Sequence, residues 1–161
     1  MSSPNPTSAP HQLPHNLGRY HILGHLASGG MAEVLLAKLI GPSGFERPVI
    51  IKRILPNLAT RSEFVTMFLD EARIIAAIRH PNVVQVQELV HDNHELYLVM
   101  EYLAGENIAG IITRYRTLNE RLEYALCAHV ISEACAGLHA THELRNINSE
   151  PLNIVHRDIS P

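Results

Sequence analysis

The stretch SEFVTMFLDEARIIAAIRH, residues 62–80, decides the fold of this chain. Its large apolar residues recur at helical spacing and fall on one face: Phe64, Phe68, Ile75 and Ile78. Glu71 lies near the middle of that face. Because an unpaired carboxylate is very costly to bury, Glu71 needs a cationic partner if this face is packed.

A candidate partner lies upstream in VIIKRIL, residues 49–55, where Lys52 follows three apolar residues in a predicted strand. An ion pair between a strand lysine and an inward-facing helix glutamate would satisfy both charges. The alternative is that Glu71 turns to solvent in a helix end that only looks regular.

The remaining pattern predicts further strands on both sides of these two stretches. Four more apolar-rich runs are expected to be strands: 19–29, 32–40, 83–92 and 94–103. Two further helices are expected, at 105–115 and 119–144. Ser62 is a plausible N-cap of the helix at 62–80, and Pro81 ends that helix. The predicted fold class is α+β, with a five-stranded antiparallel sheet, one helix packed on it, and a helical segment after it.

Composition excludes several functions. The chain of 161 residues has a net charge of −3 with scattered Lys and Arg, which argues against a nucleic-acid partner. Residues 1–16 are rich in Pro, Ser, Asn and His, so we expect a disordered tail and no signal peptide. No apolar run is long enough for a membrane segment. Cys127 and Cys135 lie in an apolar helical stretch and are expected to be reduced and buried.

Several motifs occur in a fixed order along residues 20–161: LASGGMAEV, VIIK, Glu71, HPNVV, VMEYL and HRD. In this order they resemble the first part of a eukaryotic-type protein kinase domain, most like bacterial serine/threonine kinases of the myxobacterial sort. The resemblance implies a kinase N-lobe and hinge at 17–103 and the start of the C-lobe at 104–161. It also implies ATP and Mg²⁺ as cofactors, a protein substrate, and a cytoplasmic location.

The resemblance assigns an ATP site to the glycine turn, the strand lysine and the hinge. The glycine-rich loop has alanine at two positions where the family more often has glycine, and Ile50 stands where the family usually has alanine. The implied ATP-binding residues are Leu26, Ala27, Ser28, Gly29, Gly30, Met31, Ala32, Val34, Ile50, Lys52, Met100, Glu101, Leu103 and Asn107. Lys52 would hold the α- and β-phosphates with Glu71 directing it, and Asn107 would lie near the ribose.

The segment NIVHRDISP, residues 153–161, resembles the catalytic loop of the family. Asp158 would be the catalytic base for a substrate hydroxyl, next to Lys52 and Glu71 in the implied catalytic set. Arg157 would be regulatory, because it usually pairs with a phosphorylated activation loop, and His156 would be a structural anchor. Ser160 replaces a lysine that is usual in serine/threonine kinases.

No metal ligands are expected within this chain, because the family's Mg-binding asparagine would fall at position 163 and its Asp-Phe-Gly motif later still. We therefore expect an N-terminal fragment that is inactive alone and that self-associates through an incomplete C-lobe. The alternative function is a non-catalytic nucleotide-binding or docking module. The histidine pairs His91/His94 and His139/His142 suggest a metal site only weakly, since no carboxylate or Cys set completes one.

Overall fold

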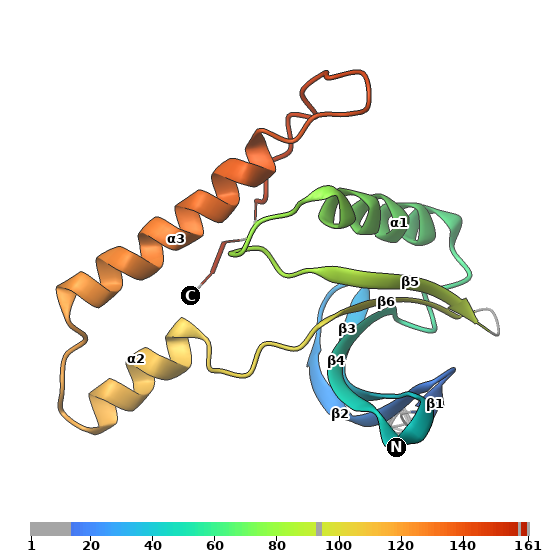
Figure 1. Cartoon of the computed structure of the whole chain (residues 1–161), viewed down its shortest axis with the longest axis horizontal. Coiled ribbons are helices and arrows are strands. Elements are labelled where there is room, and N and C mark those ends of the chain that lie inside the picture. The colour runs from blue at the N-terminus through green and yellow to red at the C-terminus, as the bar shows by residue number, and fades with distance from the viewer. Residues whose placement is uncertain (1–13, 93–94, 158, 161) are drawn as a thin grey trace, which may run out of the picture.

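The computed structural model of the chain describes residues 14–92, 95–157 and 159–160, which form one antiparallel sheet and three α-helices. The strands are β1 (Asn16–Leu17), β2 (Tyr20–Ser28), β3 (Ala32–Ile40), β4 (Glu46–Ile54), β5 (Val86–Asp92) and β6 (Glu95–Glu101). Their order in the sheet is β1-β2-β3-β4-β6-β5. The helices are α1 (Ser62–Ala77), α2 (Ile108–Thr117) and α3 (Tyr124–His142). Figure 1 shows α1 beside β5, and α2 and α3 forming an arm that extends away from the sheet.

The predicted α+β fold is confirmed, and all five predicted strands are present as β2 to β6. The sixth strand, β1, has only two residues, which is too short to give a periodic signal. The predicted N-cap of α1 was wrong. Arg61 occupies that position with no side-chain cap, while its carbonyl accepts from the amides of Phe64 and Val65. Ser62 is therefore the first residue inside the helix.

The two faces of the sheet carry two separate cores. One core contains residues of β1 to β4 and β6: Leu17, Tyr20, Ile22, Leu35, Ala37, Val49, Ile51, Tyr97 and Val99. The other joins the opposite face to α1: Ala32, Ile54, Phe68, Ala72 and Leu98. Because strand residues alternate between faces, Leu98 belongs to the α1 side while Tyr97 and Val99 belong to the other. The continuous apolar runs of β4 and β6 follow from this two-sided burial.

The sheet curls around the first core until its distant strands meet. The hydroxyl of Tyr20, on β2, donates to Glu88 Oε2 on β5 at 2.5 Å, although three strands separate β2 from β5 in the sheet. Arg19 Nη2 donates to the same oxygen at 2.7 Å. The hydrogen bond from Tyr20 lowers the pKa of Glu88, and burial raises the pKa of Tyr20. The curl is thus held by the Glu88 carboxylate, which has a lowered pKa and stays ionised at pH values where an ordinary glutamate begins to take up a proton.

The helical arm contacts the sheet side through the loop before β5. Asn82 Nδ2 donates to the Glu133 carbonyl at 2.9 Å and to Glu133 Oε2 at 2.7 Å. Gly137 is buried against the same loop, where a Cβ would lie 2.9 Å from the Asn82 carbonyl oxygen. Gly137 is therefore needed for this close approach.

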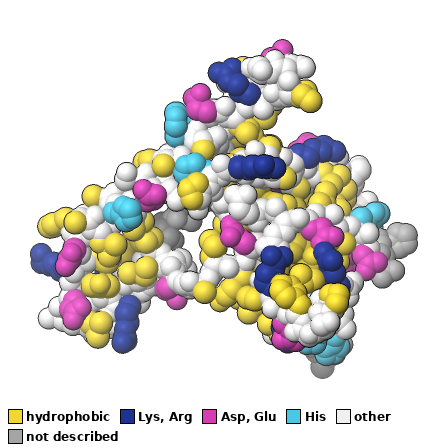
Figure 2. Space-filling view, in the orientation of Figure 1, with side chains coloured by type: hydrophobic (Ala, Val, Ile, Leu, Met, Phe, Trp, Pro, Cys, Tyr) yellow, Lys and Arg dark blue, Asp and Glu magenta, His cyan; other side chains and the backbone are white. Residues whose placement is uncertain are grey.

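The prediction that the two cysteines are buried was wrong, because Cys127 and Cys135 are both exposed. Among the described residues, α3 buries only Gly137 and Thr141, both near its C-terminal end. In the part of the chain that the structure describes, no element buries the stretch of α3 that carries the cysteines. Figure 2 shows hydrophobic side chains on the surface of the arm, where Tyr124 and Ile131 are exposed.

Residues 1–13 of the predicted tail lie outside the described residues. Its last residue, Asn16, belongs to β1 and pairs with His21 on β2. Within the described part of the chain, no helix is long and apolar enough to cross a membrane.

Tyr97 carries a buried hydroxyl that has no hydrogen-bond partner among the described residues. Its ring packs edge-on against Tyr20, with centroids 6.3 Å apart, and burial raises the pKa of Tyr97 to about 12. The folded state therefore keeps the phenol neutral, while the unfolded chain ionises near pH 10. The contribution of this pKa difference to the free energy of unfolding is fully present below about pH 10 and is lost as the pH rises toward about 12.

We expect Tyr97→Phe to raise the free energy of unfolding by about 1 kcal/mol, because it removes an unsatisfied buried hydroxyl and keeps the ring. The variant should also lose part of the alkaline decline between pH 10 and 12. Urea unfolding of both proteins at pH 7 and pH 10.5 measures both effects. Tyr115→Phe on α2 is the control. A Tyr97→Phe protein that is less stable than wild type at pH 7 would contradict this account of the hydroxyl.

Candidate functional site

The strand register brings the predicted nucleotide residues of the sheet onto one face. Val34 pairs with Lys52, Ile50 pairs with Met100, and Ala27 pairs with Val34. Directly paired residues project to the same side of a sheet. Among the predicted nucleotide residues on this face, Lys52 carries the one charge in an otherwise apolar set: Ala27, Val34, Ile50, Lys52 and Met100.

Lys52 and Glu71 form the predicted ion pair. Lys52 Nζ donates a short hydrogen bond to Glu71 Oε1 across 19 residues of sequence. Both side chains are partly buried, with exposed fractions of 22% and 32%. The prediction of an inward-facing, paired Glu71 is confirmed. The alternative of a solvent-directed glutamate was wrong.

The predicted glycine-rich loop connects β2 and β3. The Gly29 amide donates to the Ala32 carbonyl at 2.8 Å and closes the turn. Gly29 and Gly30 are exposed, and a Cβ at Gly30 would meet nothing within 4 Å. Leu26 is 53% exposed, whereas Ala32 is buried in the core beneath α1. The turn thus presents backbone and small residues at the sheet edge, next to the strands that carry Val34 and Lys52.

The predicted hinge follows β6. Glu101 ends β6, and its amide donates to the Gln85 carbonyl at 3.1 Å while its carboxylate accepts from the Gln85 amide at 2.7 Å. The Glu101 N–H is thus bonded to Gln85, the residue directly before β5. Tyr102 and Leu103 are exposed, at 39% and 61%. The hinge residues lie one after another at the end of the strand that carries Met100.

Asn107 has a structural task that the sequence reasoning missed. Its Oδ1 accepts from the Gly110 amide at 2.7 Å, so Asn107 is the N-cap of α2. The backbone N–H of Asn107 donates to Glu106 Oε1 at 3.0 Å. The side-chain oxygen is thus engaged in the helix, and a ribose hydroxyl at this place would meet the Asn107 amide NH₂ as a donor.

The segment after α3 carries the predicted catalytic loop. A bridge between Arg145 and Pro151 closes the polar loop that precedes it, and residues 152–157 have no regular structure. Arg157 is exposed with φ 64°, which is uncommon for a residue with a Cβ. Asp158, the predicted base, lies outside the described residues, so its position relative to Lys52 stays a prediction. Ser160 is exposed.

The histidine pairs were the alternative metal hypothesis. His139 and His142 lie in the last turn of α3, and His91 lies on β5, while His94 falls outside the described residues. Across the described ranges, no group of three or more His, Cys, Asp or Glu side chains could hold a metal ion.

A second charged cluster on the sheet was missed by the sequence reasoning. Arg53 donates from Nε to Glu33 Oε1 at 2.6 Å and from Nη1 to Glu95 Oε1 at 3.2 Å. Arg53 and Glu33 are among the few buried charged residues of the described chain. The signal was available, because Lys52 and Arg53 are adjacent and must project to opposite faces of β4.

The protein kinase domain family matches residues 20–161, so this chain belongs to the protein kinase family. It is 48% identical over 144 residues to the tyrosine-protein kinase MasK of Myxococcus xanthus, and 33% identical to the serine/threonine-protein kinase PrkC of Bacillus subtilis. In both comparisons 89% of this chain is aligned. It spans only 22% and 20% of the length of those two proteins.

The kinase fold is also found by comparison with solved structures. The kinase domain of Mycobacterium tuberculosis PknI superposes with a TM-score of 0.63 at 20% identity, over 91% of this chain and 54% of that domain. The chain thus spans about half of a solved kinase domain. At this identity the similarity establishes the fold.

We expect Glu71→Gln to lower the free energy of unfolding by about 1–2 kcal/mol, because Lys52 would lose a charge-assisted hydrogen bond in a half-buried site. Glu63→Gln, on the first turn of the same helix, breaks only an exposed pair with Arg61 and should change stability by less than about 0.5 kcal/mol. Urea unfolding monitored by circular dichroism compares the two variants. Equal effects would contradict the special role of the Lys52–Glu71 pair.

Proposed function

We propose that this chain is the nucleotide-binding part of a protein serine/threonine kinase that transfers the γ-phosphoryl group of ATP to a protein hydroxyl. Lys52, held by Glu71, would bind the α- and β-phosphates, and Asp158 would act as the base toward the substrate hydroxyl. The observation that carries the proposal is the Lys52–Glu71 ion pair on the face that adjoins the glycine turn.

The remaining residues of that face suit the base and sugar of a nucleotide. Val34, Ile50 and Met100 offer apolar contact to a flat ring, as ligand pockets generally do. The Glu101 carbonyl and the Leu103 amide would supply polar contacts at the ring edge. Ile50 adds bulk where the family usually has alanine, which would narrow the space for the ring.

The hydroxyl specificity rests on relatives. PrkC is named a serine/threonine kinase, whereas MasK is named a tyrosine kinase. Ser160 in place of the usual lysine removes one residue that would favour serine and threonine. We propose that the hydroxyl acceptor is serine or threonine, and transfer to tyrosine is the alternative that the assay below measures in parallel.

Phosphoryl transfer needs Mg²⁺ to neutralise the charge that develops on the phosphates. The residues that would hold it correspond to positions after Pro161, since residues 1–161 contain no Asp-Phe-Gly sequence. We therefore propose that these 161 residues bind nucleotide but do not transfer phosphate by themselves. The second candidate, a non-catalytic nucleotide-binding module in the cytoplasm, shares the binding step and lacks the transfer.

The test separates binding from transfer. Lys52→Met should weaken binding of a fluorescent ATP analogue by about ten- to a hundredfold, because it removes a charge-assisted contact to phosphate. Lys38→Met is the matched control: Lys38 also lies on the sheet but pairs with Glu46 at 2.8 Å. Equal binding by wild type and Lys52→Met would overturn the proposed role of this lysine.

Transfer is measured with radiolabelled ATP and Mg²⁺ on proteins carrying serine, threonine or tyrosine. The 161-residue chain should show none. A longer chain with the complete domain should be active and lose ~10²–10⁴ in rate on Asp158→Asn. Asp158-dependent transfer by the 161 residues alone would contradict the proposed incompleteness, and an inactive longer chain would favour the non-catalytic module.

We also propose that the isolated chain self-associates through the exposed side of α3. Tyr124 and Ile131 are 88% and 63% exposed, and exposed apolar surface of this kind favours association. Ile131→Lys should lower both the apparent mass in light scattering and the fluorescence of a bound hydrophobic dye. Ile40→Lys, at an exposed strand end, is the control. A wild-type chain that is monomeric and does not bind the dye would contradict the proposal.

A further inference from the structure

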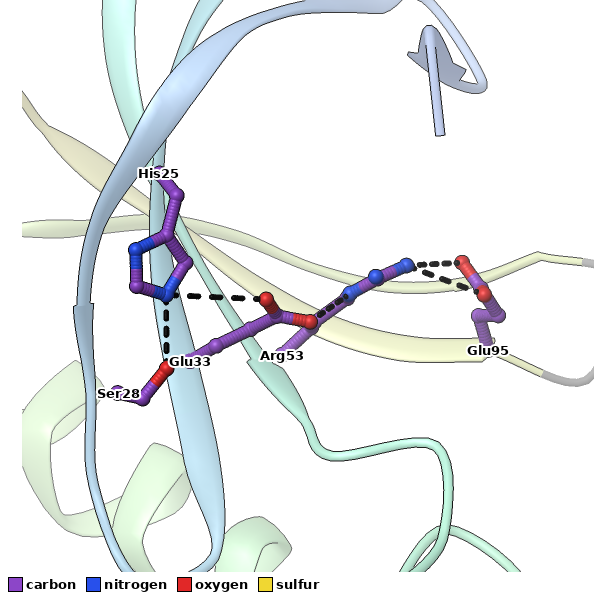
Figure 3. Close-up of polar contacts among 5 residues, drawn as sticks. All are labelled: His25, Ser28, Glu33, Arg53 and Glu95. Atoms are coloured by element: carbon purple, nitrogen blue, oxygen red, sulfur yellow. Dashed lines mark hydrogen bonds and ion pairs between the residues drawn. The ribbon is translucent and has the colours of Figure 1, made fainter. Parts of the chain in front are cut away.

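A chain of polar contacts connects the buried centre of the sheet to the glycine turn (Figure 3). Its inner end is Arg53, which bonds to Glu33 on β3 and to Glu95 on β6. The side chains of Arg53 and Glu33 are only 6% and 9% exposed. An ion pair that is buried and bonded on two sides has little freedom to move, so it provides a fixed anchor.

The outer end of the chain reaches the last residue of β2. Glu33 Oε2 lies 4.0 Å from Nε2 of His25, and the same nitrogen lies 2.7 Å from Ser28 Oγ. Ser28 pairs with Glu33 across the strands and directly precedes Gly29. The contacts thus run from Arg53 through Glu33 and His25 to Ser28, all on the sheet face opposite to Lys52.

The end of β2 needs such support, because its backbone pairing is irregular there. The register with β3 shifts between Ile22 and Gly24 and again between His25 and Ala27. The two exposed glycines that follow have no side chains to pack. Backbone bonds close the turn from the Gly29 amide to the Ala32 carbonyl at 2.8 Å, and the Leu55 amide, just after β4, donates to the Met31 carbonyl at 3.0 Å. These bonds tie the β3 end of the turn to the sheet, so side-chain support is needed at its β2 end.

We propose that His25 is a positioning residue for the glycine turn: supported by Glu33 and Arg53, it holds Ser28 and so sets where residues 29–31 lie over the phosphates. The effect of His25 on nucleotide binding rests on the proposed nucleotide site, whereas its contacts with Ser28 and Glu33 do not depend on that site. Lys52 would fix the phosphates from one face of β4, while Arg53, its neighbour, fixes the turn from the other.

The same three side chains do not form a hydrolytic triad. In a triad the carboxylate bonds to one ring nitrogen and the serine to the other. Here both Glu33 and Ser28 approach the same atom, His25 Nε2. Orientation of Ser28 is therefore the role that the geometry supports.

The test compares four variants of the full 161-residue chain. His25→Ala and Ser28→Ala each remove the bond between the two side chains. His25→Gln keeps a polar group near the position of Nε2. His21→Ala is the matched control, because His21 lies on the same strand and its ring bonds to Asn16 at 3.0 Å, away from the turn.

Hydrogen exchange of the Gly29 amide reports opening of the turn without requiring a nucleotide. His25→Ala and Ser28→Ala should accelerate it about fivefold, the factor that corresponds to an ordinary hydrogen bond of ~1 kcal/mol. His25→Gln should restore most of the protection. His21→Ala should leave it unchanged, and the free energy of unfolding in urea should fall by no more than ~1 kcal/mol in any of the four variants.

The fluorescent ATP analogue adds the functional consequence: His25→Ala should weaken its binding by a similar factor. Equal Gly29 exchange in His25→Ala and His21→Ala would overturn the proposal. A loss of protection spread over the whole sheet, with a free energy of unfolding lowered by several kcal/mol, would overturn it as well. A wild-type chain that binds no nucleotide yet shows the expected exchange pattern would refute the proposed function and leave the positioning role intact.

Discussion

Lys52 and Arg53 are adjacent cations in β4, and the alternation of the strand sends them to opposite faces of the sheet. Neither can be left alone, since both lie in a strand that is apolar on both sides and flanked by buried residues. Glu71 on α1 forms an ion pair with Lys52, and Glu33 on β3 forms one with Arg53. The charge of Lys52 therefore favours the position of α1 on one face of the sheet, and the charge of Arg53 favours the pairing of β3 with β4.

The two pairs differ in burial, and the difference matches the tasks proposed for them. The Lys52–Glu71 pair is partly exposed, so an anionic ligand can reach the ammonium and compete for it. The Arg53–Glu33 pair is almost fully buried and has a further carboxylate in Glu95. A buried pair with several bonds resists rearrangement, whereas a half-buried pair can exchange partners at modest cost. One face of β4 is thus suited to binding and the other to support.

The sequence allowed the first pair to be predicted because each charge interrupts a clear apolar period, in the helix at Glu71 and in the strand at Lys52. The second pair was missed although Arg53 interrupts the same strand, since Glu33 stands at the start of AEVLLAKLI, where a charged residue is ordinary. The exposure of Cys127 and Cys135 was also missed. Helical periodicity shows which residues share a face, but it does not show whether another element covers that face. The capping role of Asn107 was hidden for a different reason, because a single Asn before a helix serves equally well as a cap or as a ligand contact.

Two connections between the helical arm and the sheet are seen in the described residues, and their geometry limits where the segment after α3 can lie. The first is the stretch 102–107 that leads from β6 into the capped start of α2. The second is Asn82, which bonds to Glu133 and packs against Gly137 so closely that no side chain fits between them. Five residues after Gly137 the helix ends, and the closed loop 144–152 turns the chain back toward residues 153–157. The contact between the loop before β5 and α3 therefore contributes to where the predicted catalytic segment lies relative to the Lys52 face. A side chain at position 137 would force that contact apart, and it would move the catalytic segment without touching any residue of the nucleotide face.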